Sequence, residues 1–215
     1  MRDLLFLVTD GTMEQILLGF FGREQPHRSI GCGPIDLDLE PDSDIIVFAG
    51  ANDSGGYKGT ADWLRGWSRN YRHVVVMIDA EWDGSPGADA IREKIERDIA
   101  DAGWSEDAGL ALVLEPEVDI WLWADSPHVA TAMRWPSKQE LREALVREGF
   151  LGADEAKPKR PKEAAEWALR QRGVRRSRAL YKKIASQVSL KGCNDPALLQ
   201  LVEALRRWFP RERAG

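Results

Sequence analysis

The chain has 215 residues, of which 43% are hydrophobic and 30% are charged. This apolar fraction is enough for a hydrophobic core, which excludes a disordered chain, and the length suits one domain with an appendage or two small domains. No apolar run reaches about 18 residues, so we expect no membrane-spanning helix, and Asp3 beside the first apolar run argues against a signal peptide. Cys32 and Cys193 have no neighbouring partner, which excludes a disulfide framework and a cysteine zinc site and predicts a reducing, cytoplasmic compartment.

The net charge of −5 is distributed unevenly along the chain. Residues 151–215 contain 16 Lys and Arg against 7 Asp and Glu, a charge of +9, which leaves 14 basic and 28 acidic residues, a charge of −14, in residues 1–150. An acidic body joined to a basic tail indicates either a polyanionic partner or attraction between the two parts. We therefore divide the chain into an α/β domain over 1–150 and a basic helical region over 151–215.

Short apolar runs alternate with helical patterns through the first 114 residues. We expect strands at 4–8, 45–49, 74–78 and 109–114, and helices at 12–21 (capped by Thr12), 59–69 and 88–102. The glycine-rich segment 50–56 is predicted to be a flexible loop. The run at 74–78 is β-branched and fully apolar, as in strands that are covered on both faces. The alternation predicts an α/β fold with a mostly parallel sheet flanked by helices.

Beyond Pro136 the sequence has no strand pattern. We expect helices at 137–148, 162–171, 177–188 and 196–209, with Ser137 as the cap of the first. The first two of these helices are separated by a linker in which Pro158 and Pro161 prevent a continuous helix. This part is predicted to be a C-terminal helical extension.

Acidic residues follow three of the predicted strands, at the ends where an open parallel sheet binds its ligands. They are Asp10 and Glu14 after the first strand, Asp79, Glu81 and Asp83 after the third, and Glu117 and Asp119 after the fourth. Carboxylates gathered in this way repel one another unless a cation lies among them. Oxygen ligands without His or Cys favour Mg²⁺ or Mn²⁺ over zinc. The alternative to a metal site is that these acidic residues lie in separate loops exposed to solvent.

Basic residues are concentrated between Lys157 and Lys183. Six of them are candidates for contacts with nucleic-acid phosphates: Arg172, Arg175, Arg176, Arg178, Lys182 and Lys183. The alternative is that this segment docks on the acidic body. Tyr181 and Trp167 are expected to pack between helices, and His73 is expected at the surface.

The strand-end motifs resemble those of Toprim domains, which occur in topoisomerases, primases and OLD-type nucleases. Residues 74–84, VVVMIDAEWDG, are similar to the second Toprim motif, with Glu81 in place of its second Asp. The likeness is nearer to small standalone Toprim-like proteins of bacterial phage-defence systems, including methylation-associated defence loci. Residues 114–125, LEPEVDIWLWAD, then Lys157-Pro158 and a helical tail follow in the same order, so that the resemblance covers roughly residues 4–208.

The resemblance implies a Toprim/Rossmann-like fold and a metal-dependent site, with Mg²⁺ or Mn²⁺, that acts on or recognises nucleic-acid phosphodiesters. It implies that Asp79, Glu81 and Asp83 hold a metal, that Glu117 and Asp119 orient this site or hold a second metal, and that the basic tail positions the nucleic-acid backbone. Such a protein would be a metal-dependent nuclease of an anti-phage system, with other defence proteins as partners.

The chain departs from the family pattern at one position. The family has a Glu directly after the first strand, whereas this chain has Thr9, so Asp10 or Glu14 would have to act as the acid/base. The departure favours an alternative of a different class, a non-catalytic structural subunit of a defence complex with a degenerate Toprim site.

Two other motifs fail on inspection. Residues 9–12, TDGT, resemble part of the aspartate-phosphatase motif, but Val8 occupies the position of the nucleophile. Residues 50–60 are glycine-rich and include Lys58, but they do not match the phosphate-binding consensus of nucleotide-binding loops. A nucleotide-binding regulator that uses this segment is a third hypothesis.

Overall fold

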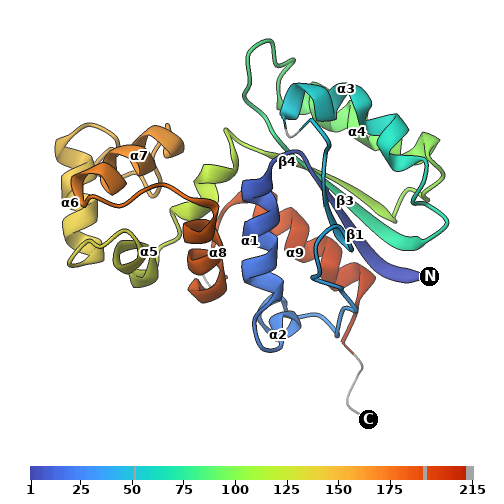
Figure 1. The fold of residues 1–215 in the computed structure, drawn as a ribbon, viewed down its shortest axis with the longest axis horizontal. Helices are drawn as coiled ribbons and strands as arrows, with labels where there is room; N and C mark the ends of the chain where they lie inside the picture. The colour runs from blue at the N-terminus through green and yellow to red at the C-terminus, as the bar shows by residue number, and fades with distance from the viewer. Residues whose placement is uncertain (51, 191–192, 212–215) are drawn as a thin grey trace.

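The computed structural model describes residues 1–50, 52–190 and 193–211. Within these ranges four parallel strands form one sheet in the order β2-β1-β3-β4 (Figure 1). They are β1 (Arg2–Val8), β2 (Ile45–Val47), β3 (Tyr71–Asp79) and β4 (Gly109–Leu114). The predicted α/β class is confirmed, and all four strands lie where the apolar runs placed them, although β2 ends two residues early.

The strand order creates a topological switch point between β1 and β3. The chain passes from β1 outward to β2 and then returns to β3 on the other side of β1, where Val8 pairs with Met77. Crossovers that leave a sheet in opposite directions open a crevice outside the carboxyl ends of the two strands, which is the usual ligand position in such sheets. Thr9, Asp10 and Asp79 stand at or directly after these two ends.

Two hydrophobic clusters cover the two faces of the sheet. On one face, Leu5 and Leu7 pack with α3 (Asp53–Leu64) and α4 (Ala88–Asp101). On the other face, Leu4 and Phe6 pack with α1 (Gly11–Phe21), α8 (Arg178–Gln187) and α9 (Pro196–Trp208). The alternation of successive β1 residues between the clusters follows from the two-residue repeat of a strand.

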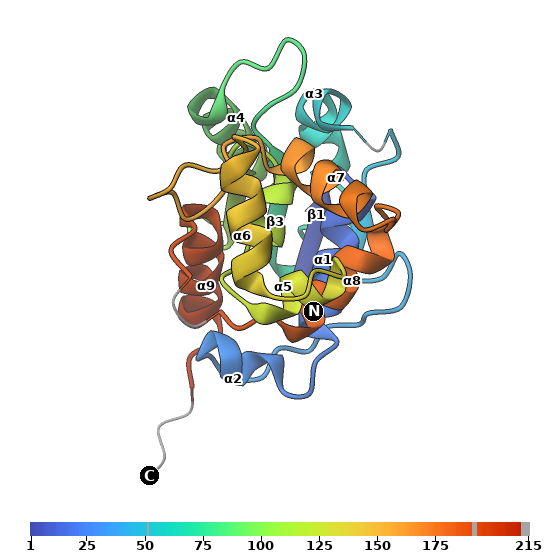
Figure 2. The same ribbon diagram turned by 90° about the vertical axis from the view of Figure 1, so that its left-hand side faces the viewer.

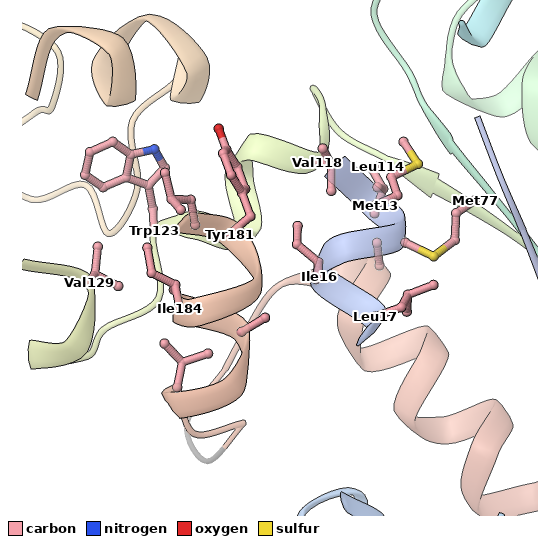
Figure 3. Close-up of a cluster of buried hydrophobic side chains, with 14 of the residues drawn as sticks. Met13, Ile16, Leu17, Met77, Leu114, Val118, Trp123, Val129, Tyr181 and Ile184 are labelled. Carbon is pink, nitrogen blue, oxygen red and sulfur yellow. The ribbon is translucent and has the colours of Figure 1, made fainter. Parts of the chain in front are cut away.

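The larger cluster joins the sheet to the C-terminal helices. It extends from Met77 in the sheet through Ile16 on α1 to Tyr181 and Ile184 on α8 (Figure 3). A Cβ on Gly19 would lie 2.3 Å from the Lys182 carbonyl oxygen, so α1 and α8 are in backbone contact and only glycine fits there. Residues on both sides of position 150 therefore share one core.

The remaining elements are short or lie to one side of the sheet. They are α2 (Pro26–Ile30), the 3₁₀ helix η1 (Val118–Leu122), α5 (Pro127–Ala132), α6 (Lys138–Arg147) and α7 (Pro161–Gln171). Helices α5, α6 and α7 form a lobe beyond α8, away from the sheet (Figures 1 and 2). No helix in the described part of the chain is long and apolar enough to cross a membrane.

Two predictions at helix starts were wrong. Asp10, not Thr12, caps α1, because its side chain accepts the Thr12 N–H. Helix α3 begins at Asp53 instead of residue 59, because the Asn52 Oδ1 accepts the Gly55 N–H at 2.7 Å. Most of the expected flexible loop at 50–56 is thus the first turn of a helix, while Ala51 lies outside the described residues. Helix α3 also ends at Leu64, five residues before the predicted end, whereas the other predicted helices are confirmed to within one residue at each end.

Candidate functional site at the carboxyl edge of the sheet

Asp53 links the ends of β1 and β3. Its Oδ1 accepts a 2.5 Å hydrogen bond from the Thr9 hydroxyl and a 3.1 Å hydrogen bond from the Asp79 N–H. Thr9 is buried and its own N–H donates to the Met77 carbonyl at 3.2 Å. The first residue of α3 therefore places a carboxyl group directly over the switch point.

Asp79 is a buried carboxyl at this edge, with 7% of its surface exposed. Its Oδ1 accepts a 2.7 Å hydrogen bond from the Val118 N–H, at the start of η1. Burial raises the pKa of Asp79 well above its ordinary value, and the negative charge of Asp53 adds to the shift, followed by those of Asp10 and Glu117. Burial and the charge of Asp10 likewise raise the pKa of Asp53, against the hydrogen bond from Thr9.

Glu117 lies at the end of the loop after β4 and is partly buried. Burial and the neighbouring charge of Asp119 raise the pKa of Glu117 to about 7, although Lys162 opposes this shift. A carboxyl group with this pKa exchanges a proton near neutral pH, which is the property of a general acid or base.

The carboxylate of Asp119 is ion-paired with Arg176, in the basic C-terminal region. Arg176 Nη2 contacts both of its carboxylate oxygens, at 2.9 and 3.0 Å, and the Tyr181 hydroxyl donates to Oδ1. Arg176 Nε also donates to the Tyr181 oxygen at 2.7 Å, so that the three side chains form a closed network. Asp119 is thereby engaged in holding the start of α8 against η1.

The other predicted acidic residues lie around this centre rather than in it. Asp10 caps α1 and is close enough to shift the pKa values of Asp53 and Asp79. Glu14 is in the first turn of α1 and accepts from Gln15 at 3.2 Å, whereas Glu81 and Asp83 are exposed in the turn after β3. Within the described ranges, no three Asp, Glu, His or Cys side chains form a group that could hold a metal ion as they stand.

The six predicted basic residues divide into two sets. Three contact the protein itself: Arg176 pairs with Asp119, Arg172 lies 4.5 Å over the Trp135 ring, and Arg178 packs so closely that a Cβ on Gly11 would lie 2.5 Å from its Cζ. The other three, Arg175, Lys182 and Lys183, are exposed, as is Arg178 despite its contact with α1. The segment therefore docks in part on the body and leaves part of its charge to solvent.

The predictions for aromatic residues had mixed outcomes. Tyr181 is buried in the larger cluster and Trp167 packs against Trp135, with ring centroids 6.0 Å apart, so their packing roles are confirmed. The surface position expected for His73 was wrong, because its ring stacks on Trp208 at 4.5 Å where α9 ends.

Sequence reasoning missed Asp53, which makes two of the central hydrogen bonds. The glycines of segment 50–56 indicate a loop, whereas the cap residue Asn52 followed by Asp53 and Ser54 is the local sign of a helix start. Nothing local predicts that this start lies over Thr9, which is 44 positions away in the chain.

Comparison of the chain with protein-family models, with curated proteins and with solved structures finds no match.

Proposed function

We propose that the carboxyl edge of the sheet binds a divalent cation, Mg²⁺ or Mn²⁺, and acts on or recognises a nucleic-acid phosphodiester, as a component of an anti-phage defence system. The defence role and its protein partners rest on the Toprim resemblance alone, and the cytoplasmic location rests on the two free cysteines. The contact between Asp53 and Asp79 supports the cation site. The Asp79 backbone N–H donates to the Asp53 carboxyl group, and the charge of Asp53 helps to raise the pKa of Asp79. Within the described residues no basic side chain pairs with either carboxyl group.

The chemistry of these groups fits a hard divalent cation. Asp10, Asp53 and Asp79 offer only oxygen donors. The charges of Asp10 and Asp53 disfavour ionisation of Asp79, and that of Asp10 disfavours ionisation of Asp53, a cost that a cation would remove. When bound, the cation would supply charge stabilisation at a phosphate group. Glu81 and Asp83, at the exposed turn, are less suited to this role than Asp53.

The residues of the chain would contribute the rest of the activity. Glu117, with its pKa of about 7, would hold or release a proton beside the site. Asp53, fixed by the Thr9 hydroxyl, provides the carboxyl group that is missing directly after β1. Arg175, Lys182 and Lys183 remain exposed for contacts with the phosphate backbone, which position nucleic acid without reading its sequence.

One observation favours the alternative of a non-catalytic structural subunit. Asp119, implied by the resemblance to orient the site or to bind metal, is committed to Arg176 and Tyr181. A side chain that ties the tail to the body stabilises a scaffold whether or not the neighbouring acids bind a cation. In this alternative the exposed part of the tail contacts another defence protein.

Cleavage assays with Asp79→Asn and the matched exposed variant Asp83→Asn distinguish the two functions. The proposed activity predicts Mn²⁺-dependent cleavage of DNA or RNA, loss of cleavage in Asp79→Asn and retention in Asp83→Asn. It also predicts that Mn²⁺ raises the Tm of the wild type, because a ligand that binds only the folded state stabilises it. Absence of both cleavage and the Tm shift would overturn the cation-dependent function and leave the structural subunit.

A further inference from the structure

A cavity of about 380 Å³ lies among α1, α8, α9 and the segment from η1 to α5. Apolar side chains form most of its wall, including Phe20 and Ile16 from α1, Ile184 from α8, and Leu201 and Leu205 from α9. Its volume falls in the range of small-molecule sites, roughly 300–1,000 Å³. It is separate from the carboxyl edge, because Asp53, Asp79 and Glu117 are not among its lining residues.

The charged residues at the cavity are paired, with one exception. Lys157 pairs with Asp195 at 3.0 Å, and Asp125 pairs with Lys138. Arg23 lines the same cavity, and within the described ranges it has no carboxylate partner. The wall therefore has one cation whose charge no acidic side chain balances.

Arg23 is held in place by the carboxyl end of α8. Its Nε and Nη2 donate to the Ala185 carbonyl, the former at 3.0 Å, and Nη2 also donates to the Val188 carbonyl at 2.7 Å. The guanidinium lies 4.5 Å over the Phe20 ring. Burial lowers the pKa of Arg23, because removal from water disfavours the charged form. An anion at this position would compensate for the lost solvation.

We propose that this cavity binds an amphipathic monoanion, a fatty-acid-like carboxylate, with its chain among the apolar side chains of α1, α8 and α9 and its headgroup at Arg23. The apolar wall selects a hydrocarbon chain, and the unbalanced guanidinium selects a negative headgroup over a neutral or cationic one. The inference is independent of the cation-dependent function, since the two sites share no residue.

Calorimetric titration with dodecanoate, below its micelle concentration, tests the inference. The expected result is saturable binding of one equivalent, with affinity rising roughly four-fold for each methylene from octanoate to dodecanoate. Arg23→Gln keeps an N–H donor for the Ala185 carbonyl but removes the charge. It should weaken dodecanoate binding about ten-fold or more and leave binding of dodecanol unchanged.

A variant that fills the cavity provides the second test. Ala185→Leu adds volume to the wall and should abolish binding, whereas the control Gln187→Leu adds the same side chain at an exposed position of α8 and should bind normally. Three results would overturn the inference: no saturable binding of dodecanoate, equal binding of dodecylammonium, or undiminished binding in Ala185→Leu when circular dichroism shows that the variant is folded.

Discussion

The Thr9 hydroxyl donates a 2.5 Å hydrogen bond to the Oδ1 of Asp53, which joins the end of β1 to the start of α3. The first turn of α3 packs closely against the end of β1, since a Cβ on Gly56 would lie 2.3 Å from the Thr9 Cγ2. The Asp79 N–H shares the same oxygen, so one carboxyl group holds both central strands and the helix that crosses them. This contact fixes the carboxyl group of Asp53 over the ends of β1 and β3.

Thr9→Val removes the hydroxyl and leaves the buried Asp53 oxygen with one donor fewer. We expect the free energy of unfolding, measured in urea, to fall by about 1–2 kcal/mol. Thr9→Ser, which keeps the hydroxyl, should recover much of this loss. Thr131→Val, a change at an exposed threonine, serves as the control and should stay within about 0.5 kcal/mol of the wild type. Equal losses in Thr9→Val and Thr131→Val would contradict the role assigned to the Thr9 hydroxyl.

Asp79→Asn should stabilise the metal-free protein while removing the proposed activity. The amide keeps an oxygen to accept the Val118 N–H but carries no charge to repel Asp53. We expect the free energy of unfolding at neutral pH in EDTA to rise by about 1 kcal/mol, as at other functional sites where charge repulsion costs stability. A marked loss of stability would show that the charge of Asp79 supports the fold.

Glu117 should make stability depend on pH. Its folded-state pKa of about 7 is raised, so its contribution is fully present below the unfolded-state value and is lost as the pH rises through the folded-state value. Between about pH 5 and about pH 7 the wild type should lose about 1 kcal/mol through this group, roughly half of the full linkage value because the side chain is partly exposed. Urea unfolding of Glu117→Gln at both values should show a flatter dependence. Identical slopes for the two proteins would be inconsistent with the raised pKa.

Arg176→Ala would leave the buried carboxylate of Asp119 without its cation. Removing one partner of a buried ion pair costs about 3–5 kcal/mol, and because Arg176 is 31% exposed we expect the lower end of that range. The neighbouring exposed residue provides a matched control, since Arg175→Ala should change stability by less than about 0.5 kcal/mol. Limited proteolysis should show earlier cleavage near α8 in Arg176→Ala alone. Similar behaviour of the two variants would mean that the pair does not hold the tail.

The features that the sequence predicted correctly are those with a local signal. The apolar run at 74–78 is a buried strand because β-branched side chains suit a position between two helical layers. Asp79 lies at the carboxyl edge of the sheet because it ends this strand. Helices α2 and α5 escaped prediction because five or six residues do not complete two turns and show no periodicity.

The features that escaped prediction depend on contacts between distant segments. Asp53 reaches Thr9 across 44 positions, and Arg176 reaches Asp119 across 57. The sequence left open whether the basic tail faces a polyanion or its own acidic body. The structure shows that part of it, Arg172, Arg176 and Arg178, contacts the protein, through Trp135, Asp119 and α1 respectively, all distant in the sequence.

The central claim is that Asp53 and Asp79 together bind a divalent cation at the carboxyl edge. Calorimetric titration of Mn²⁺ into the wild type and into Asp53→Asn, Asp79→Asn and Asp83→Asn tests it most directly. We predict saturable binding in the wild type and in Asp83→Asn, and loss of binding in both Asp53→Asn and Asp79→Asn. Binding that persists in Asp53→Asn and Asp79→Asn, or that is absent from the wild type, would contradict the claim.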